Sequence, residues 1–249
     1  MSNLTQRVLT ALVAAPIVLG LAWVGGWAFA AFIAVVVAAA QWEVYRLSRA
    51  AGAHPQRALG LVLGALIVLR PVIDSEVVGA VVVAGLVIML VRELYRRREG
   101  PLFNAAATAF GLVYPALLAS YVVDLRVRSA FTLEDPEPFV LTATALLAAW
   151  AADTFAYFAG RAFGRHPLFP RVSPKKTWEG LLGGAVGAVL FALGLKALAL
   201  PSLTWADAAV VGVLSGFFGP LGDLAESLFK RSVGVKDSAA YLPGHGGFL

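Results

Sequence analysis

The sequence predicts an all-α, polytopic membrane protein with about eight membrane-spanning helices. Of its 249 residues, 59% are hydrophobic and only 14% are charged, and a mean hydropathy of +0.80 is too high for a soluble domain. Apolar stretches near the ~20 residues that cross about 30 Å of hydrocarbon recur along the whole chain. Because lipid offers no hydrogen-bond partners to an open sheet edge, we expect these stretches to form helices.

The predicted spans follow one another with short connections. The first resembles a signal peptide but lacks a convincing cleavage site, so we expect a retained span. Gly25-Gly26 separates it from the second span, which predicts a helical hairpin. Some of the spans are short and would cross tilted or only in part. The expected helices cover residues 8–24, 27–42, 58–73, 77–91, 105–123, 139–159, 180–200 and 207–222.

Glycines recur at helical spacing in the last two predicted spans. This pattern is typical of helices that pack closely in a membrane. We therefore expect packing, rather than ligand contact, from the glycines at 183, 184, 187, 212, 216 and 219.

The basic residues are distributed unevenly between the two sides of the predicted bundle. Sixteen of the twenty lie on the side of the N-terminus, which predicts that both termini are cytoplasmic. The net charge of +5 then indicates contact with anionic lipid rather than nucleic acid. The absence of cysteine excludes disulfides and thiolate chemistry. This assignment also places the 160–179 loop on the same face as a polar run near the C-terminus, residues 222–247, which we call the polar C-terminal run.

The polar C-terminal run contains two carboxylates and a cation at helical spacing. Asp223, Glu226 and Lys230 lie at i, i+3 and i+7, so they share one face if the last span continues as a helix. Asp223 and Glu226 are suited to a Mg²⁺ site completed by water and phosphate oxygens. The alternative is a Glu226–Lys230 ion pair beside an interfacial carboxylate.

The segment from Ser173 to Gly180 precedes the seventh span. Pro174 suits a first helical turn that Ser173 would cap. Free amides at that helix start, together with Lys175 and Lys176, predict a phosphate site. Lysines beside lipid headgroups, with Trp178 as an interfacial aromatic residue, are the alternative.

Two further groups are candidates for chemistry. We expect Asp153, late in the sixth span, to be the most buried ionisable group, where it pairs with Arg161, contacts a metal or orients a ligand hydroxyl. Lys236, Asp237 and His245 lie in a glycine-rich loop whose backbone can approach phosphate closely. A lone loop histidine is more often simply solvated.

These residues resemble the CDP-diacylglycerol synthase family, the phosphatidate cytidylyltransferases. The resemblance covers roughly the last hundred residues in the family's order and spacing, whereas the first 140 match mainly in hydropathy. The chain accordingly divides into N-terminal helices over 1–138 and a catalytic region over 139–249. The matching segments are residues 153–157, 160–161, 163–165, 173–180, 221–227, 229–231 and 235–247.

The resemblance implies that CTP and phosphatidate react to CDP-diacylglycerol and pyrophosphate at the cytoplasmic face of the plasma (inner) membrane. It implies Mg²⁺, with room for a second cation, and it allows a homodimer. Asp223 corresponds to a metal-site aspartate. The phosphate-facing cations would be Lys175, Lys176, Lys230, Arg231 and Lys236, and the polar lining would comprise Asp153, Ser173, Asp237 and His245.

The sequence departs from the family pattern at its end. In the family an Asp-Arg-x-Asp segment and a further span follow the His-Gly-Gly element, and the second metal-site aspartate is in that segment. We therefore expect a chain truncated before its last segment, with an inactive family member as one alternative function. A CTP-dependent polyprenol or phytol kinase and a transporter are the others.

Overall fold

The computed structural model describes residues 3–127, 137–199, 203–239 and 247–249. Contacts divide the chain into two compact units, residues 1–131 with 232–249 and residues 132–231. The two units are defined by contacts within the structure. The regions 1–138 and 139–249 are defined instead by how specifically their motifs match a family, so the division at residue 138 stays a prediction.

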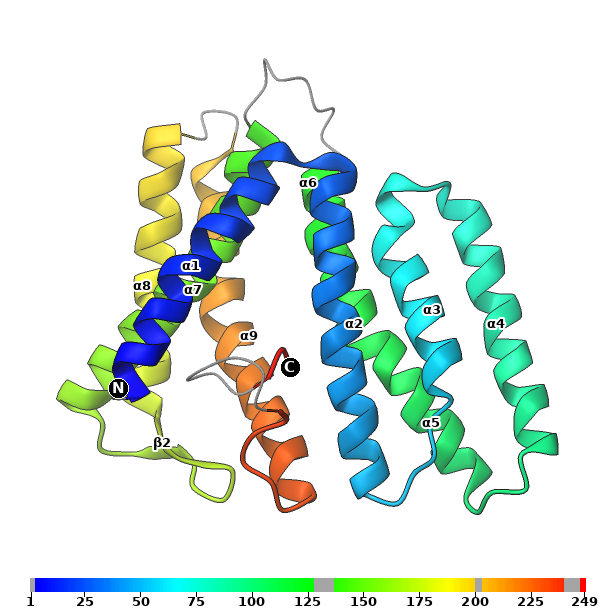
Figure 1. The fold of residues 1–249 in the computed structure, drawn as a ribbon. Coiled ribbons are helices and arrows are strands. Elements are labelled where there is room, and N and C mark those ends of the chain that lie inside the picture. Colours follow the sequence, from blue (N-terminus) through cyan, green and yellow to red (C-terminus); the bar gives the residue numbers. More distant parts are fainter. Residues whose placement is uncertain (1–2, 128–136, 200–202, 240–246) are drawn as a thin grey trace. The chain divides into compact units, whose positions relative to one another are not determined.

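The first unit is helical throughout its described elements. Pro115 lies in a π-helical stretch, where its missing N–H and its ring prevent a regular α-helical ladder. The helices (Figure 1) are α1 Asn3–Val24, α2 Gly26–Ala50, α3 Arg57–Leu69, the 3₁₀ turn η1 Arg70–Val72, α4 Ser75–Tyr95, α5 Pro101–Gly111, the π-helix η2 Leu112–Leu117 and α6 Leu118–Val127.

Apolar and polar contacts both hold this unit together. Gln41 on α2 donates to the carbonyls of Gly60 and Gly111, at 3.2 and 2.9 Å. A Cβ at Gly111 or Gly60 would overlap the Tyr45 ring, so these glycines make room for buried polar side chains. The apolar core beside them comprises Ala30, Val37, Leu63, Ile67, Val68, Leu112, Ala116 and Val123.

Arg126 fixes the chain reversal between α1 and α2. Its fully buried guanidinium donates to the carbonyls of Ala22 (2.5 Å) and Trp23 (3.0 Å), which lack helical partners at the end of α1. Gly25 follows with a φ of +68°, and a Cβ there would lie 2.5 Å from Arg126 Nη2. The reversal predicted at Gly25-Gly26 is confirmed.

The second unit packs three long helices and carries a hairpin at one end (Figure 1). The hairpin is antiparallel, with Pro167 opposite Thr177 and Phe169 opposite Ser173. These strands lie within the segment 160–179, which the sequence predicted only as a loop. The elements are α7 Glu137–Phe163, β1 Pro167–Phe169, β2 Ser173–Thr177, α8 Trp178–Ala199 and α9 Trp205–Ser232.

Glycines bring these three helices close together. A Cβ at Gly184 of α8 would lie 2.7 Å from the Ala152 carbonyl oxygen of α7. A Cβ at Gly216 of α9 would lie 2.5 Å from Ala185 Cα of α8, and Gly212 is equally tight against Val189. The predicted packing role is thus confirmed, except that Gly219 faces open space.

Six helices in the described part of the chain are long and apolar enough to cross a membrane. Each segment predicted as a span forms helix over nearly all of its described residues, but α3 has 13 residues and only a shorter apolar stretch, Leu12–Val24, is found in α1. Large apolar side chains, among them Leu94 at 80% exposure and Leu198 at 85%, cover the outside of the helices. The protein is therefore an all-α, polytopic membrane protein, although a count of eight spans is not confirmed.

Replacing Gly216 by alanine should destabilise the protein through overpacking. Gly216→Ala and Gly219→Ala gain the same helix propensity, but only the first places a methyl group against Ala185. We expect Gly216→Ala to be less stable than Gly219→Ala by about 1–3 kcal/mol. Thermal unfolding in detergent measures the difference, and equal melting temperatures would contradict the packing role.

Candidate functional site

An ion pair joins the hairpin to α9 at one end of the second unit. Lys176 Nζ of β2 lies 2.5 Å from Asp223 Oδ2 of α9 and donates to the Pro220 carbonyl at 3.2 Å. The Asp223 side chain is 54% exposed, so the pair is accessible. This contact brings the 160–179 loop together with the part of the polar C-terminal run that lies on α9, whereas the shared membrane face stays a prediction.

Apolar packing places Lys176 beside Asp223. Leu168 of β1 is buried against Leu181 of α8 and Leu224 of α9, and Val172 at the hairpin turn covers the same cluster. Because successive residues of a strand point to opposite faces, Lys176 turns toward α9 whereas Lys175 is exposed. The sequence could not distinguish these two lysines.

Helix α8 begins at Trp178, so the prediction that Ser173 and Pro174 start this helix is wrong. Both residues belong to strand β2, which pairs with β1. Thr177 caps the helix instead, since its hydroxyl accepts the Gly180 N–H at 3.1 Å. Glu179 accepts the backbone N–H groups of Arg165 and His166 and lies 2.6 Å from His166 Nδ1, which fixes the entry to the hairpin.

Asp153 is exposed on α7, so the expectation that it is the most buried ionisable group is wrong. Helix α7 packs on α8 through Ala152 and Ala156, and Asp153 lies about 100° around the helix from Ala152. It lies within electrostatic range of both Asp223 and Lys176. Its suggested partner Arg161 donates instead to the Tyr157 hydroxyl, at 3.1 Å.

Helix α9 continues to Ser232, which confirms that Asp223, Glu226 and Lys230 share a face. Lys230 Nζ donates to Glu226 Oε1 at 2.6 Å, so this carboxylate has the helical partner that the alternative interpretation foresaw. Arg231 lies exposed near the end of the same helix. Within the described part of the chain, no cluster of three or more metal-binding side chains is present.

The remaining predicted residues follow α9. Lys236 and Asp237 are exposed and belong to the first unit, whereas Lys176 and Asp223 belong to the second. Ser238, directly after them, is buried and donates to Glu43 Oε2 at 2.6 Å. His245 lies outside the described residues.

Sequence reasoning missed Glu43 on α2, which is completely buried. The signal was a carboxylate one residue beyond the apolar stretch predicted as the second span. Its partners are distant in sequence, so spacing alone does not reveal them.

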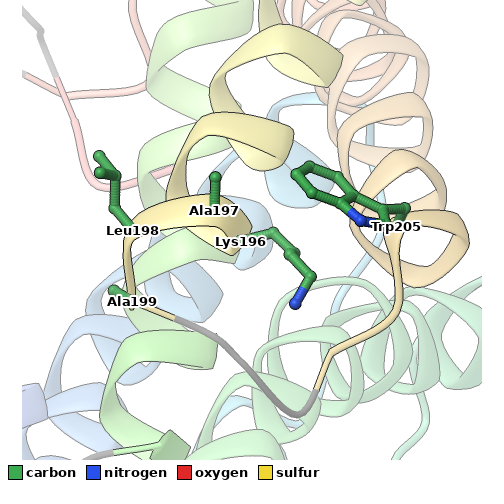
Figure 2. Close-up of a pocket in the computed structure, with 5 residues that line it drawn as sticks. All are labelled: Lys196, Ala197, Leu198, Ala199 and Trp205. Carbon is green, nitrogen blue, oxygen red and sulfur yellow. The ribbon is translucent and has the colours of Figure 1, made fainter.

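A surface pocket lies at the far end of α8 from the hairpin (Figure 2). There Lys196 Nζ lies 5.6 Å from the centre of the Trp205 ring. Among the predicted site residues that the structure describes, none lines this pocket, which is formed by Lys196, Ala197, Leu198, Ala199 and Trp205.

Comparison with known proteins identifies the family. The model of the cytidylyltransferase family matches residues 5–249. The chain belongs to the cytidylyltransferase family. A phosphatidate cytidylyltransferase from Brucella abortus (strain 2308) is 37% identical to this cytidylyltransferase over 255 residues, which cover 100% of the chain and 88% of the relative.

Relatives from photosynthetic organisms are also similar to this cytidylyltransferase. The phosphatidate cytidylyltransferase of Synechocystis is 33% identical, with 98% of the chain and 90% of the relative covered. Phosphatidate cytidylyltransferase 5, chloroplastic, of Arabidopsis thaliana is 34% identical, with 92% and 63% covered. The resemblance recognised in the motifs is confirmed, and it extends to the N-terminal helices.

Loss of the Thr177 hydroxyl should destabilise the hairpin–helix junction. Thr177→Ala leaves the Gly180 N–H without its cap, which we expect to cost about 1 kcal/mol. Ser173→Ala, on the same strand, is the matched control and should change stability by less than about 0.5 kcal/mol. Thermal unfolding in detergent compares the two, and a larger loss for Ser173→Ala would restore the original cap assignment.

Proposed function

We propose that this cytidylyltransferase is a phosphatidate cytidylyltransferase, which converts CTP and phosphatidate into CDP-diacylglycerol and pyrophosphate in phospholipid biosynthesis. The observation that carries the proposal is the similarity to relatives of that name over the whole chain. The contact between Lys176 and Asp223 supports it, because a cation and a carboxylate meet at an accessible place on α9.

The proposed reaction joins two anions. An oxygen of the phosphatidate phosphate attacks the α-phosphorus of CTP, a new P–O bond forms, and the bond to the leaving pyrophosphate breaks. The attacking phosphate is already ionised at neutral pH, so a strong general base is not needed. Positioning and charge neutralisation are therefore the main demands on the protein.

The described residues fit a Mg²⁺ ion that is held partly by substrate. Asp223 and Asp153 offer carboxylate oxygens within electrostatic range of each other, and Mg²⁺ commonly takes one or two carboxylates plus water and phosphate oxygens. When bound, Mg²⁺ supplies neutralisation of phosphate charge. A metal-binding role for Glu226 stays a prediction, since this carboxylate is paired with Lys230. A second cation also stays a prediction.

The cations of the chain bind and orient phosphate in this proposal. Lys176 is the first candidate, because an incoming phosphate can replace Asp223 as its partner. Lys175 and Ser173 on the same strand, and Arg231 at the end of α9, are further candidates on the same unit. Lys230, Lys236, Asp237 and His245 keep their predicted roles as expectations.

We further propose a plasma (inner) membrane location with both ends of this chain in the cytoplasm. The sixteen-to-four distribution of basic residues supports this orientation. The family resemblance also allows a homodimer, and mass measurement in nanodiscs would test it.

Neutralising Asp223 should abolish turnover. Asp223→Asn removes a carboxylate from the proposed metal site, and we expect at least about a 100-fold loss of kcat. The assay follows labelled CTP into CDP-diacylglycerol in micelles that contain phosphatidate. Label in the lipid from the cytidine moiety also separates this activity from a lipid kinase, which would transfer only phosphate.

Asp207→Asn provides the matched control on the same helix. Asp207 lies in the first turn of α9 and accepts a hydrogen bond from Thr204, at the opposite end from Asp223. The activity of the Asp207→Asn variant should match that of the wild type. Normal turnover by Asp223→Asn would reject the metal role.

Removing the Lys176 charge should weaken nucleotide binding. Lys176→Met keeps the aliphatic chain but loses the phosphate partner, so we expect KM for CTP to rise about 10-fold or more. Lys196→Met, near the other end of α8, is the control and should leave KM unchanged. An unaltered CTP dependence of Lys176→Met would remove this lysine from the site.

A further inference from the structure

Glu43 is a completely buried carboxylate near the end of α2, and both of its oxygens are engaged. Oε2 accepts hydrogen bonds from the Ser238 hydroxyl at 2.6 Å and from the Leu249 backbone N–H at 3.1 Å. Oε1 accepts the Phe248 backbone N–H at 2.9 Å. One side chain thus contacts two places that lie ten residues apart in sequence, and all of these residues belong to the first unit.

Gly247 shows how closely this segment approaches the carboxylate. A Cβ at position 247 would overlap Glu43 Oε2 and Ser238 Oγ. Glycine is therefore required here by contact with the protein itself. The sequence had attributed the glycines of this loop to the approach of phosphate, and the structure gives Gly247 a different use.

The hydrogen bonds make Glu43 hard to replace. A buried carboxylate is costly unless donors surround it, and backbone N–H groups are costly when they lose their acceptor. Glutamine has the same shape but only one acceptor oxygen, and its NH₂ group would face a donor. Glu43→Gln should therefore loosen the segment without opening a cavity.

We infer that Glu43 is a positioning residue: by holding Ser238, Phe248 and Leu249, its carboxylate fixes the adjoining Lys236 and Asp237 for the reaction. This inference rests on the proposed function, in which Lys236 faces phosphate. Ser238 follows Asp237 directly, so the hydrogen bond from its hydroxyl holds the residue immediately after the two predicted residues. Glu43 itself touches no substrate in this account.

Hydrogen exchange tests the contact without depending on activity. In Glu43→Gln, the amides of Phe248 and Leu249 should exchange faster than in the wild type. Tyr45→Phe is the matched control, since it removes a buried hydrogen bond to Thr108 from the same helix and should leave these amides unchanged. Unchanged exchange in Glu43→Gln would overturn the contact.

Kinetics test the positioning role. We expect Glu43→Gln to lower kcat/KM for CTP by about 10- to 100-fold, as misplacement of a distant group can. Ser238→Ala should lower it in the same direction, and it serves as the second variant if Glu43→Gln fails to fold. Tyr45→Phe should keep the wild-type kcat/KM at a temperature where it is folded.

A double-variant cycle separates positioning from general stability. If Glu43 acts through Lys236, the double variant Glu43→Gln/Lys236→Ala should lose less kcat/KM for CTP than the product of the fold-losses of the two single variants. A loss equal to that product would overturn the inference, as would wild-type kinetics for Glu43→Gln. A wild-type protein that makes no CDP-diacylglycerol would instead reject the proposed function, while hydrogen exchange would still report on the Glu43 contact.

Discussion

The Lys176–Asp223 ion pair, in which a carboxylate of an apolar helix is matched by a cation, joins the hairpin to α9. The same constraint recurs along the chain. Glu226 has Lys230, and Glu43 has a hydroxyl and two backbone N–H groups. Each of these carboxylates thus has a partner, and for Asp223 and Glu43 the partner joins segments that are distant in sequence.

Close packing of small residues supplies the frame for the ion pair. Gly184 and Gly216 allow α8 to approach α7 and α9, and Leu168 anchors the hairpin against both α8 and α9. In lipid, helices are held together by dispersion contacts between closely packed backbones rather than by a hydrophobic driving force. These glycines therefore contribute to helix association because they let the backbones approach. The frame explains why a short two-stranded hairpin can hold Lys176 in one place.

Much of this architecture was predictable because its signals are local. Hydropathy located the helices, and spacing placed Asp223, Glu226 and Lys230 on one face of α9. The start of α8 was mispredicted because Ser173-Pro174 is a good helix start, whereas pairing with β1 overrides that preference. Asp153 was expected to be buried because depth in a span was taken as burial, although burial depends on which face packs. Glu43 meets Ser238 across 195 positions, and no periodicity encodes such a contact.

The mutual neutralisation of Lys176 and Asp223 has a thermodynamic consequence. Each charge is paired with the other in this structure, so a ligand that takes only one of them leaves its former partner unpaired. An anion and a cation that arrive together satisfy both at once. On the proposed function, nucleotide and divalent ion therefore raise each other's affinity by the same factor, because linkage between two binding equilibria is reciprocal. If that function holds, this ion pair makes the protein discriminate against incomplete combinations of nucleotide and divalent ion.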